Sequence, residues 1–112
     1  MFEAQIKLIV IDLLVLLADG DYESVMERCR DSRLTSDDLR TAIRKYGRKV
    51  IAPPADYANL RMYKLKARAV PTWSVDADVW TEEEGPSDLT LQLTIAFSPS
   101  GPDIEIDDIR VM

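Results

Sequence analysis

The chain has 112 residues, the size of one domain with a single hydrophobic core, so we expect one domain over residues 1–112. Its composition, 46% hydrophobic and 30% charged, is that of an ordinary globular protein and argues against a disordered chain. The net charge of −6 counts against nucleic-acid binding, because affinity for phosphates depends on Lys and Arg, and it suits a basic protein partner.

The chain contains no histidine and a single cysteine, Cys29. Without histidine, Ser-His and Cys-His nucleophilic catalysis is excluded and a conventional zinc site is disfavoured. One cysteine forms no intramolecular disulfide, and this usage predicts a reducing compartment, which we take to be the cytoplasm. We predict no catalytic residue, no metal site and no cofactor.

The first predicted helix spans about residues 3–18 and is apolar on nearly all sides. A bilayer span needs roughly 20 apolar residues. This run is shorter and is interrupted by Lys7 and Asp12, so we predict a core helix and no membrane contact. If one domain leaves part of this helix uncovered, a homodimer would bury it.

Further helices are predicted at about residues 22–30 and 36–46. In the second of these, Thr35 is placed as the N-cap and Asp38 completes a near capping box. Gly47 ends this helix. Cationic side chains crowd its C-terminal end, where they favour the helix dipole.

After a proline-rich connector at residues 52–55, period-two alternation predicts a curved four-stranded antiparallel meander. Its strands span about residues 62–69, 73–81, 88–97 and 104–111. Helices on one face of such a sheet make an α+β domain. The parity of the last strand switches across Asp107 and Asp108, which predicts a β-bulge that keeps the apolar residues inside.

Opposite charges fall on the polar parity of the first two strands. If the turn between them centres on Pro71, Lys66 lies opposite Asp76 and Lys64 lies opposite Asp78. Such cross-strand ion pairs contribute up to about 1 kcal/mol each and would help to fix this register. Ion pairing explains these aspartates better than a catalytic role does.

The loop between the two central strands is predicted to centre near Gly85, which places Val75 opposite Ile95. Its three glutamates, residues 82–84, lack the ligand spacing of a calcium loop, so we predict a solvated acidic loop.

Trp80 falls on the polar parity, where a large aromatic side chain either covers Met62 on the neighbouring strand or contacts a partner. The candidate binding surface is therefore the open face of the sheet. Its candidate residues are Trp80, Asp76, Asp78, Gln92, Lys64 and Lys66.

Several segments resemble known families. The aliphatic first helix, the turn Gly20-Asp21-Tyr22-Glu23 and the last strand, which reads Ile106-Asp107-Asp108-Ile109, resemble the cystatin-like or NTF2-like superfamily. Residues 80–85 and 87–91, together with that strand, are similar to a family of small uncharacterised bacterial proteins. The resemblance covers most of the chain and implies a fold more than an activity.

NTF2-like domains include isomerases, hydrolases, dimeric adaptors and toxin-immunity partners, so the resemblance leaves two functions open. The favoured one is a non-catalytic binding domain, of which an immunity protein against a basic toxin is one version. The alternative is a small-molecule enzyme or ligand carrier with an Asp base in a helix–sheet cavity and Tyr22, Tyr46 or Tyr57 as hydrogen-bond donor. A filled core favours the first function, and an apolar cavity holding a carboxylate favours the second. We predict the filled core.

Overall fold

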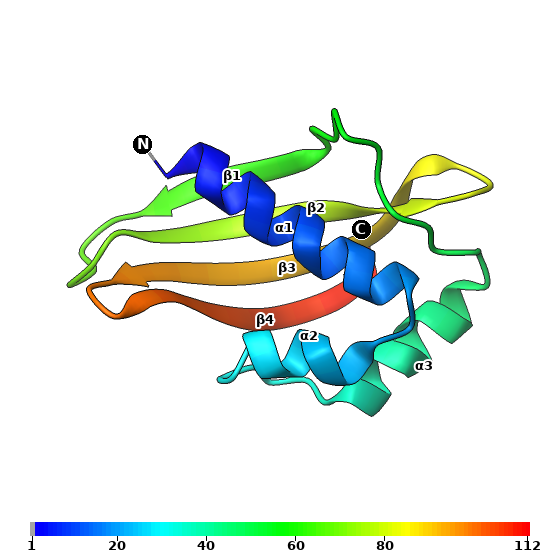
Figure 1. The fold of residues 1–112 in the computed structure, drawn as a ribbon, viewed down its shortest axis with the longest axis horizontal. Coiled ribbons are helices and arrows are strands. Elements are labelled where there is room, and N and C mark those ends of the chain that lie inside the picture. Colours follow the sequence, from blue (N-terminus) through cyan, green and yellow to red (C-terminus); the bar gives the residue numbers. More distant parts are fainter. Residues whose placement is uncertain (1) are drawn as a thin grey trace.

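The computed structural model describes residues 2–112. Within these residues, three helices and a four-stranded antiparallel sheet follow one another along the chain, which confirms the predicted α+β class and meander. The elements are α1 (Glu3–Ala18), α2 (Tyr22–Arg28), α3 (Ser36–Tyr46), β1 (Leu60–Leu65), β2 (Thr72–Thr81), β3 (Gly85–Ser98) and β4 (Gly101–Val111). In Figure 1, α1 crosses one face of the curved sheet, while α2 and α3 lie near β4.

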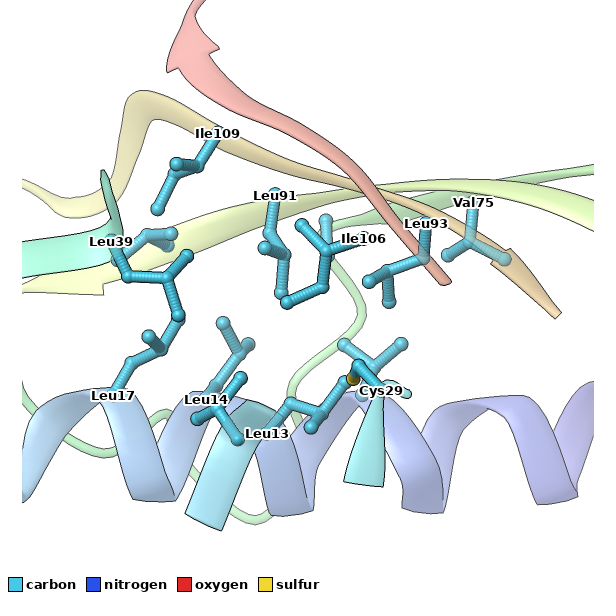
Figure 2. Close-up of a cluster of buried hydrophobic side chains, with 14 of the residues drawn as sticks. Leu13, Leu14, Leu17, Cys29, Leu39, Val75, Leu91, Leu93, Ile106 and Ile109 are labelled. Carbon is cyan, nitrogen blue, oxygen red and sulfur yellow. The ribbon is translucent and has the colours of Figure 1, made fainter. Parts of the chain in front are cut away.

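The core lies between α1 and the sheet. Figure 2 shows α1 side chains directed toward those of β3 and β4, among them Leu13, Leu14, Leu17, Leu91, Leu93 and Ile106. Cys29 and Leu39 join this cluster from the other helical segments and are fully buried. Burial raises the pKa of the Cys29 thiol to about 12, so the thiol stays protonated at neutral pH, as expected for a core residue.

The outward side of α1 is mixed: Leu8 is 69% exposed, and Gln5 and Asp12 are exposed as well. No helix within residues 2–112 is long and apolar enough to cross a membrane.

The limits of the two shorter helices are set by the residues at their ends. The predicted capping box of α3 is present, since Thr35 accepts a hydrogen bond from the Asp38 amide and Asp38 accepts one from the Thr35 amide. Gly47, at φ 75°, ends this helix as expected. α2 is two residues shorter than predicted because Cys29, with φ −123°, already leaves the helical conformation.

β1 is shorter than the predicted strand. It spans Leu60–Leu65 rather than about residues 62–69, and residues 66–71 form a loop. In this loop Ala67 has a left-handed conformation, φ 57°, which does not continue a strand. The connection between β1 and β2 is therefore a wide loop instead of a tight turn at Pro71.

The wide loop changes the pairing of β1 with β2. Lys64 lies opposite Trp73, and Lys66 lies outside the strand. The predicted pairs of Lys66 with Asp76 and of Lys64 with Asp78 are therefore wrong.

Burial of apolar side chains explains the observed register. The shift from the predicted pairing is an odd number of residues, which exchanges the two faces of β1. As a result, Leu60 and Met62 pack against the core, and Arg61 takes the position opposite Asp76. Removing two large apolar side chains from water outweighs cross-strand ion pairs, which contribute only tenths of a kcal/mol up to about 1 kcal/mol.

β2 and β3 keep the predicted parity in a shifted register. Val75 lies opposite Leu93, so the predicted pairing with Ile95 is wrong. The loop occupies residues 82–84 and pairs Thr81 with Gly85, which alone would place Val75 opposite Leu91. An irregularity in the pairing between Asp78 and Trp80 moves the partner by two residues, to Leu93.

The predicted bulge in β4 is confirmed. Asp107 is the extra residue between Ile106 and Asp108, whose partners on β3 are adjacent. The bulge leaves Ile106 and Ile109 buried on the same face. The last apolar residue, Val111, is 60% exposed, so the bulge does not bring the whole apolar set inside.

Candidate functional site

The open face of the sheet is the side opposite the helices. Alternate residues of β2 and β3 form the core, so the residues between them point to this open face. Pairing with β3 places alternate residues of β4 there as well. The carboxylates of the open face are those of Asp76, Asp78, Asp103, Glu105, Asp107 and Asp108.

The centre of the open face is ordered by side-chain hydrogen bonds. The Gln92 amide donates to the Asp76 carboxylate, with Nε2 3.3 Å from Oδ1. The Arg61 guanidinium binds Asp78, with Nη2 2.9 Å from Oδ1 and Nη1 3.4 Å from Oδ2. The structure thus brings together Asp76, Asp78 and Gln92, as the sequence parity predicted. Arg61 was missed, and reading Leu60 and Met62 as the buried parity would have found it.

The β4 side of the open face carries carboxyl groups in mutual contact. The bulge aims Asp107 at Thr94, whose hydroxyl donates to Asp107 Oδ2 at 2.7 Å. A hydrogen bond between the Glu105 and Asp107 carboxyl groups raises the pKa of Glu105, and partial burial and the Asp107 charge add to this effect. The positive charge of Arg33 offsets it only in part. This region therefore has an excess of negative charge that a cation would relieve.

Lys64 and Lys66 do not belong to this surface. Lys64 has the parity of the helix side, and Lys66 lies in the loop after β1. Both side chains are exposed.

Trp80 is half-buried and packs against the connector that precedes β1. Its ring meets that of Tyr57 edge-on, with centroids 6.2 Å apart and planes at 74°. Tyr57 in turn donates to the backbone oxygens of Asn59 and Asp78, each at 2.8 Å. The ring of Trp80 also lies over Gly85, where an added Cβ would be 3.5 Å away. Trp80 therefore fastens the connector and the loop to the sheet.

The loop at residues 82–84 is bound to the end of α3. The Tyr46 hydroxyl contacts the Glu84 carboxylate at 2.8 and 2.9 Å. Glu83 accepts a hydrogen bond from the Lys49 amide at 3.0 Å, and the Lys49 ammonium lies 3.8 Å from Glu82. The glutamates are exposed, as predicted, but each has a partner that sequence reasoning missed. Within residues 2–112, no group of acidic or cysteine side chains is arranged to hold a metal ion.

The tyrosines suggested by the resemblance have other contacts. Tyr22 lies under the Arg40 guanidinium, 5.3 Å from the ring centroid. Tyr46 binds Glu84, and Tyr57 binds backbone oxygens. Every aspartate and glutamate side chain among the described residues is at least partly exposed. The interior of the domain therefore offers no carboxylate partner to any of the three tyrosines.

A groove of about 420 Å³ lies outside the core, between α3 and the end of β4. Leu89 and Ile109 are its buried apolar residues, and its charged residues are Asp38, Lys45 and Arg110.

These features define an α+β domain with a buried hydrophobic core and an acidic open sheet face. The chain belongs to the family described as a domain of unknown function (DUF7668), which matches residues 14–112. No curated protein matches the chain. The resemblance to a family without an assigned activity is thereby confirmed, while a bacterial origin and a cystatin-like or NTF2-like fold stay predictions.

Proposed function

We propose that this chain is a non-catalytic interaction domain that binds a basic protein surface on the open face of its sheet. The observation that carries the proposal is the concentration of carboxylates there, with Glu105 and Asp107 in direct contact. Arg61 is already bound to Asp78, so it does not neutralise the β4 side of the face.

A basic partner fits this surface for an electrostatic reason. Lys or Arg side chains placed between the carboxylates of β4 would remove their repulsion, and the net charge of −6 would accelerate encounter with such a partner. The resemblance to NTF2-like adaptors and immunity partners supports the same function. A cytoplasmic location fits the single buried thiol.

The alternative function, a ligand carrier, is favoured by the groove between α3 and β4. Its volume of about 420 Å³ falls in the range of small-molecule sites. The enzyme form of this alternative has less support, because an Asp base in a helix–sheet cavity would need a buried carboxylate, and the described residues hold none.

Charge neutralisation on the open face tests the proposal. The probe is fluorescently labelled polylysine, and the variant combines Glu105→Gln, Asp107→Asn and Asp108→Asn, which keep the oxygen acceptors that contact Thr94 and the Ile109 amide. We expect about a tenfold loss of affinity at physiological salt, because these carboxylates face the cationic chain together.

The matched control removes the same charge elsewhere, with Asp19→Asn, Glu23→Gln and Glu27→Gln at exposed positions of the helical half. Equal weakening by both variants would mean that polylysine senses net charge alone, and the proposal would fail. A native mass spectrum of protein purified gently from its own source adds a second arm. A retained basic chain supports the proposal. A homodimer without any other chain counts against a basic protein partner, and a stoichiometric small molecule favours the ligand carrier.

A further inference from the structure

The outer edge of β4 is interrupted at its centre by side chains and by the segment after α2. The Ile106 amide donates to Ser32 Oγ at 2.8 Å, and the Arg33 amide donates to the Ile106 carbonyl at 3.4 Å. Beyond the bulge, the Asp108 carboxylate accepts from the Ile109 amide at 2.9 Å. These bonds interrupt the edge at its centre, so it offers no continuous run of free backbone groups to another strand.

The end of β2 that extends past β1 is also covered. The Ile51 amide donates to the Trp80 carbonyl at 3.0 Å, and the Glu82 amide donates to the Lys49 carbonyl at 2.9 Å. These bonds surround a bridge between Val50 and Thr81, so the segment before the proline connector pairs with the end of β2 like a short extra strand.

The outer edge of β1 has no such cover. The Asp78 amide donates to the Asn59 carbonyl at 2.9 Å, and antiparallel alternation then turns the backbone groups of Leu60, Met62 and Lys64 outward. No backbone or side-chain group of residues 2–112 is hydrogen-bonded to these outward groups. The strand, Leu-Arg-Met-Tyr-Lys-Leu, also contains no proline and pairs with β2 without a bulge, which are two of the devices that block an edge. Its charged residues, Arg61 and Lys64, disfavour another basic strand but not an acidic one.

The hairpin that begins with β1 is basic in an acidic protein. Residues 60–71 contain Arg61, Lys64, Lys66 and Arg68 and no carboxylate. Of these cations, Arg61 alone forms an ion pair within residues 2–112. Lys64, Lys66 and Arg68 line an open hollow of about 580 Å³ formed by residues 64–71. Free cations thus lie beside a free strand edge.

We propose that the outer edge of β1 binds an extended acidic polypeptide segment as an additional strand. Main-chain hydrogen bonds to Leu60, Met62 and Lys64 would supply affinity, and carboxylates of the segment would contact the cations of the loop. A second copy of the chain fits less well, because residues 60–71 of that copy would bring no carboxylate to these cations. This surface is separate from the acidic face and takes a partner of the opposite charge.

A designed peptide tests the edge directly. The probe is a labelled peptide of about ten residues that alternates Val and Glu, and its control carries Pro at alternate Val positions, which removes backbone N–H donors and keeps the charge. We expect fluorescence anisotropy to show binding of the first peptide about tenfold tighter than binding of the second. We also expect amide hydrogen exchange at Leu60, Met62 and Lys64 to slow when the first peptide is added.

Two protein variants assign the binding to β1. Lys64→Glu combined with Lys66→Glu and Arg68→Glu should weaken the peptide by about tenfold, whereas the matched change Arg30→Glu, Arg44→Glu and Arg48→Glu in the helical half should stay within about twofold. Met62→Pro removes an outward N–H and should abolish binding; if this variant does not fold, the charge variants and hydrogen exchange still decide.

Three results would overturn the proposal. Equal affinity for the Pro-containing peptide would show simple charge attraction. Peptide binding without slower exchange in β1 would place the site elsewhere. Concentration-dependent dimerisation of the free protein that protects the same amides would make a second copy the occupant.

Discussion

The tips of the β1–β2 and β2–β3 hairpins carry opposite charges and differ in how they are held. The acidic tip, residues 82–84, is bound to the end of α3 through Tyr46 and Lys49. The basic tip, residues 66–71, has no ion pair or hydrogen bond from its charged side chains within residues 2–112. Charge in a loop thus has a structural use at one tip and stays available for a partner at the other.

The same contrast separates stability from binding. Substitutions at the acidic tip should change the free energy of unfolding, because its side chains join elements that are distant in sequence. Substitutions at the basic tip should leave folding nearly unchanged. The predictions that follow test this division.

Trp80→Ala should have the largest effect. The half-buried ring packs on Tyr57 and Gly85, so its loss should lower the free energy of unfolding by about 2–4 kcal/mol in urea denaturation. The sequence left two alternatives for Trp80, cover of Met62 or contact with a partner, and if the second held, folding would stay nearly intact without the ring. The contact with Tyr57 predicts a loss of stability instead. The control is Tyr63→Ala on β1, where the side chain is 53% exposed and the change should stay near about 0.5 kcal/mol. Equal losses in the free energy of unfolding for Trp80→Ala and Tyr63→Ala would contradict the greater structural role of the acidic tip.

Gly85→Ala should lower the free energy of unfolding by about 1–2 kcal/mol. Gly85 has φ 70°, and an L-residue in that left-handed conformation pays a steric cost. The space at this position does not add to the cost, since the added Cβ would reach the Trp80 ring at an ordinary 3.5 Å. Thermal unfolding monitored by circular dichroism measures the loss, and an unchanged melting temperature would show that the tip relaxes freely.

Tyr46→Phe should cost about 1 kcal/mol at neutral pH, because the hydroxyl contacts the exposed Glu84 carboxylate and accepts from the Asp88 amide at 3.3 Å. Partial burial and the bond to Glu84 raise the pKa of Tyr46 in the folded state. Its stabilisation is therefore complete below the pKa of an unfolded tyrosine, about 10, and declines as the pH rises above it.

Urea denaturation of both proteins between neutral and alkaline pH measures this difference. The gap between wild type and Tyr46→Phe should narrow at high pH. The control Tyr63→Phe removes an exposed hydroxyl and should leave the free energy of unfolding unchanged at neutral pH. A gap that widens with pH would refute the assigned hydrogen bonds.

Local signals sufficed for the helices and for the curvature of the last strand. The capping residues Thr35 and Asp38 lie three positions apart and act within one helical turn, so the start of α3 was predictable. The bulge at Asp107 followed from parity alone. The polar parity likewise brought Asp76 and Gln92 together in the predicted site.

Features that depend on how distant segments of the chain pack together were not predictable. The register of β1 was predicted from Lys–Asp pairs, but burial of Leu60 and Met62 decides it. The bond between Tyr46 and Glu84 spans 38 residues of sequence, and it exists only because α3 ends beside the β2–β3 loop. No periodicity within either segment indicates that contact.

Ala67→Gly at the basic tip should have the smallest effect and the opposite sign. Ala67 adopts φ 57°, so glycine removes a steric cost of about 1–2 kcal/mol and adds back about 0.5–1 kcal/mol of chain entropy. The free energy of unfolding should therefore rise by about 0.5 kcal/mol, measured as a shift of the urea midpoint at constant slope. Since the charged side chains of the loop have no partner within residues 2–112, the same variant should bind the alternating Val/Glu peptide less tightly, because a more flexible loop loses more entropy on ordering. A destabilised variant would mean that Ala67 packs against the domain and that the basic tip, like the acidic one, contributes to folding.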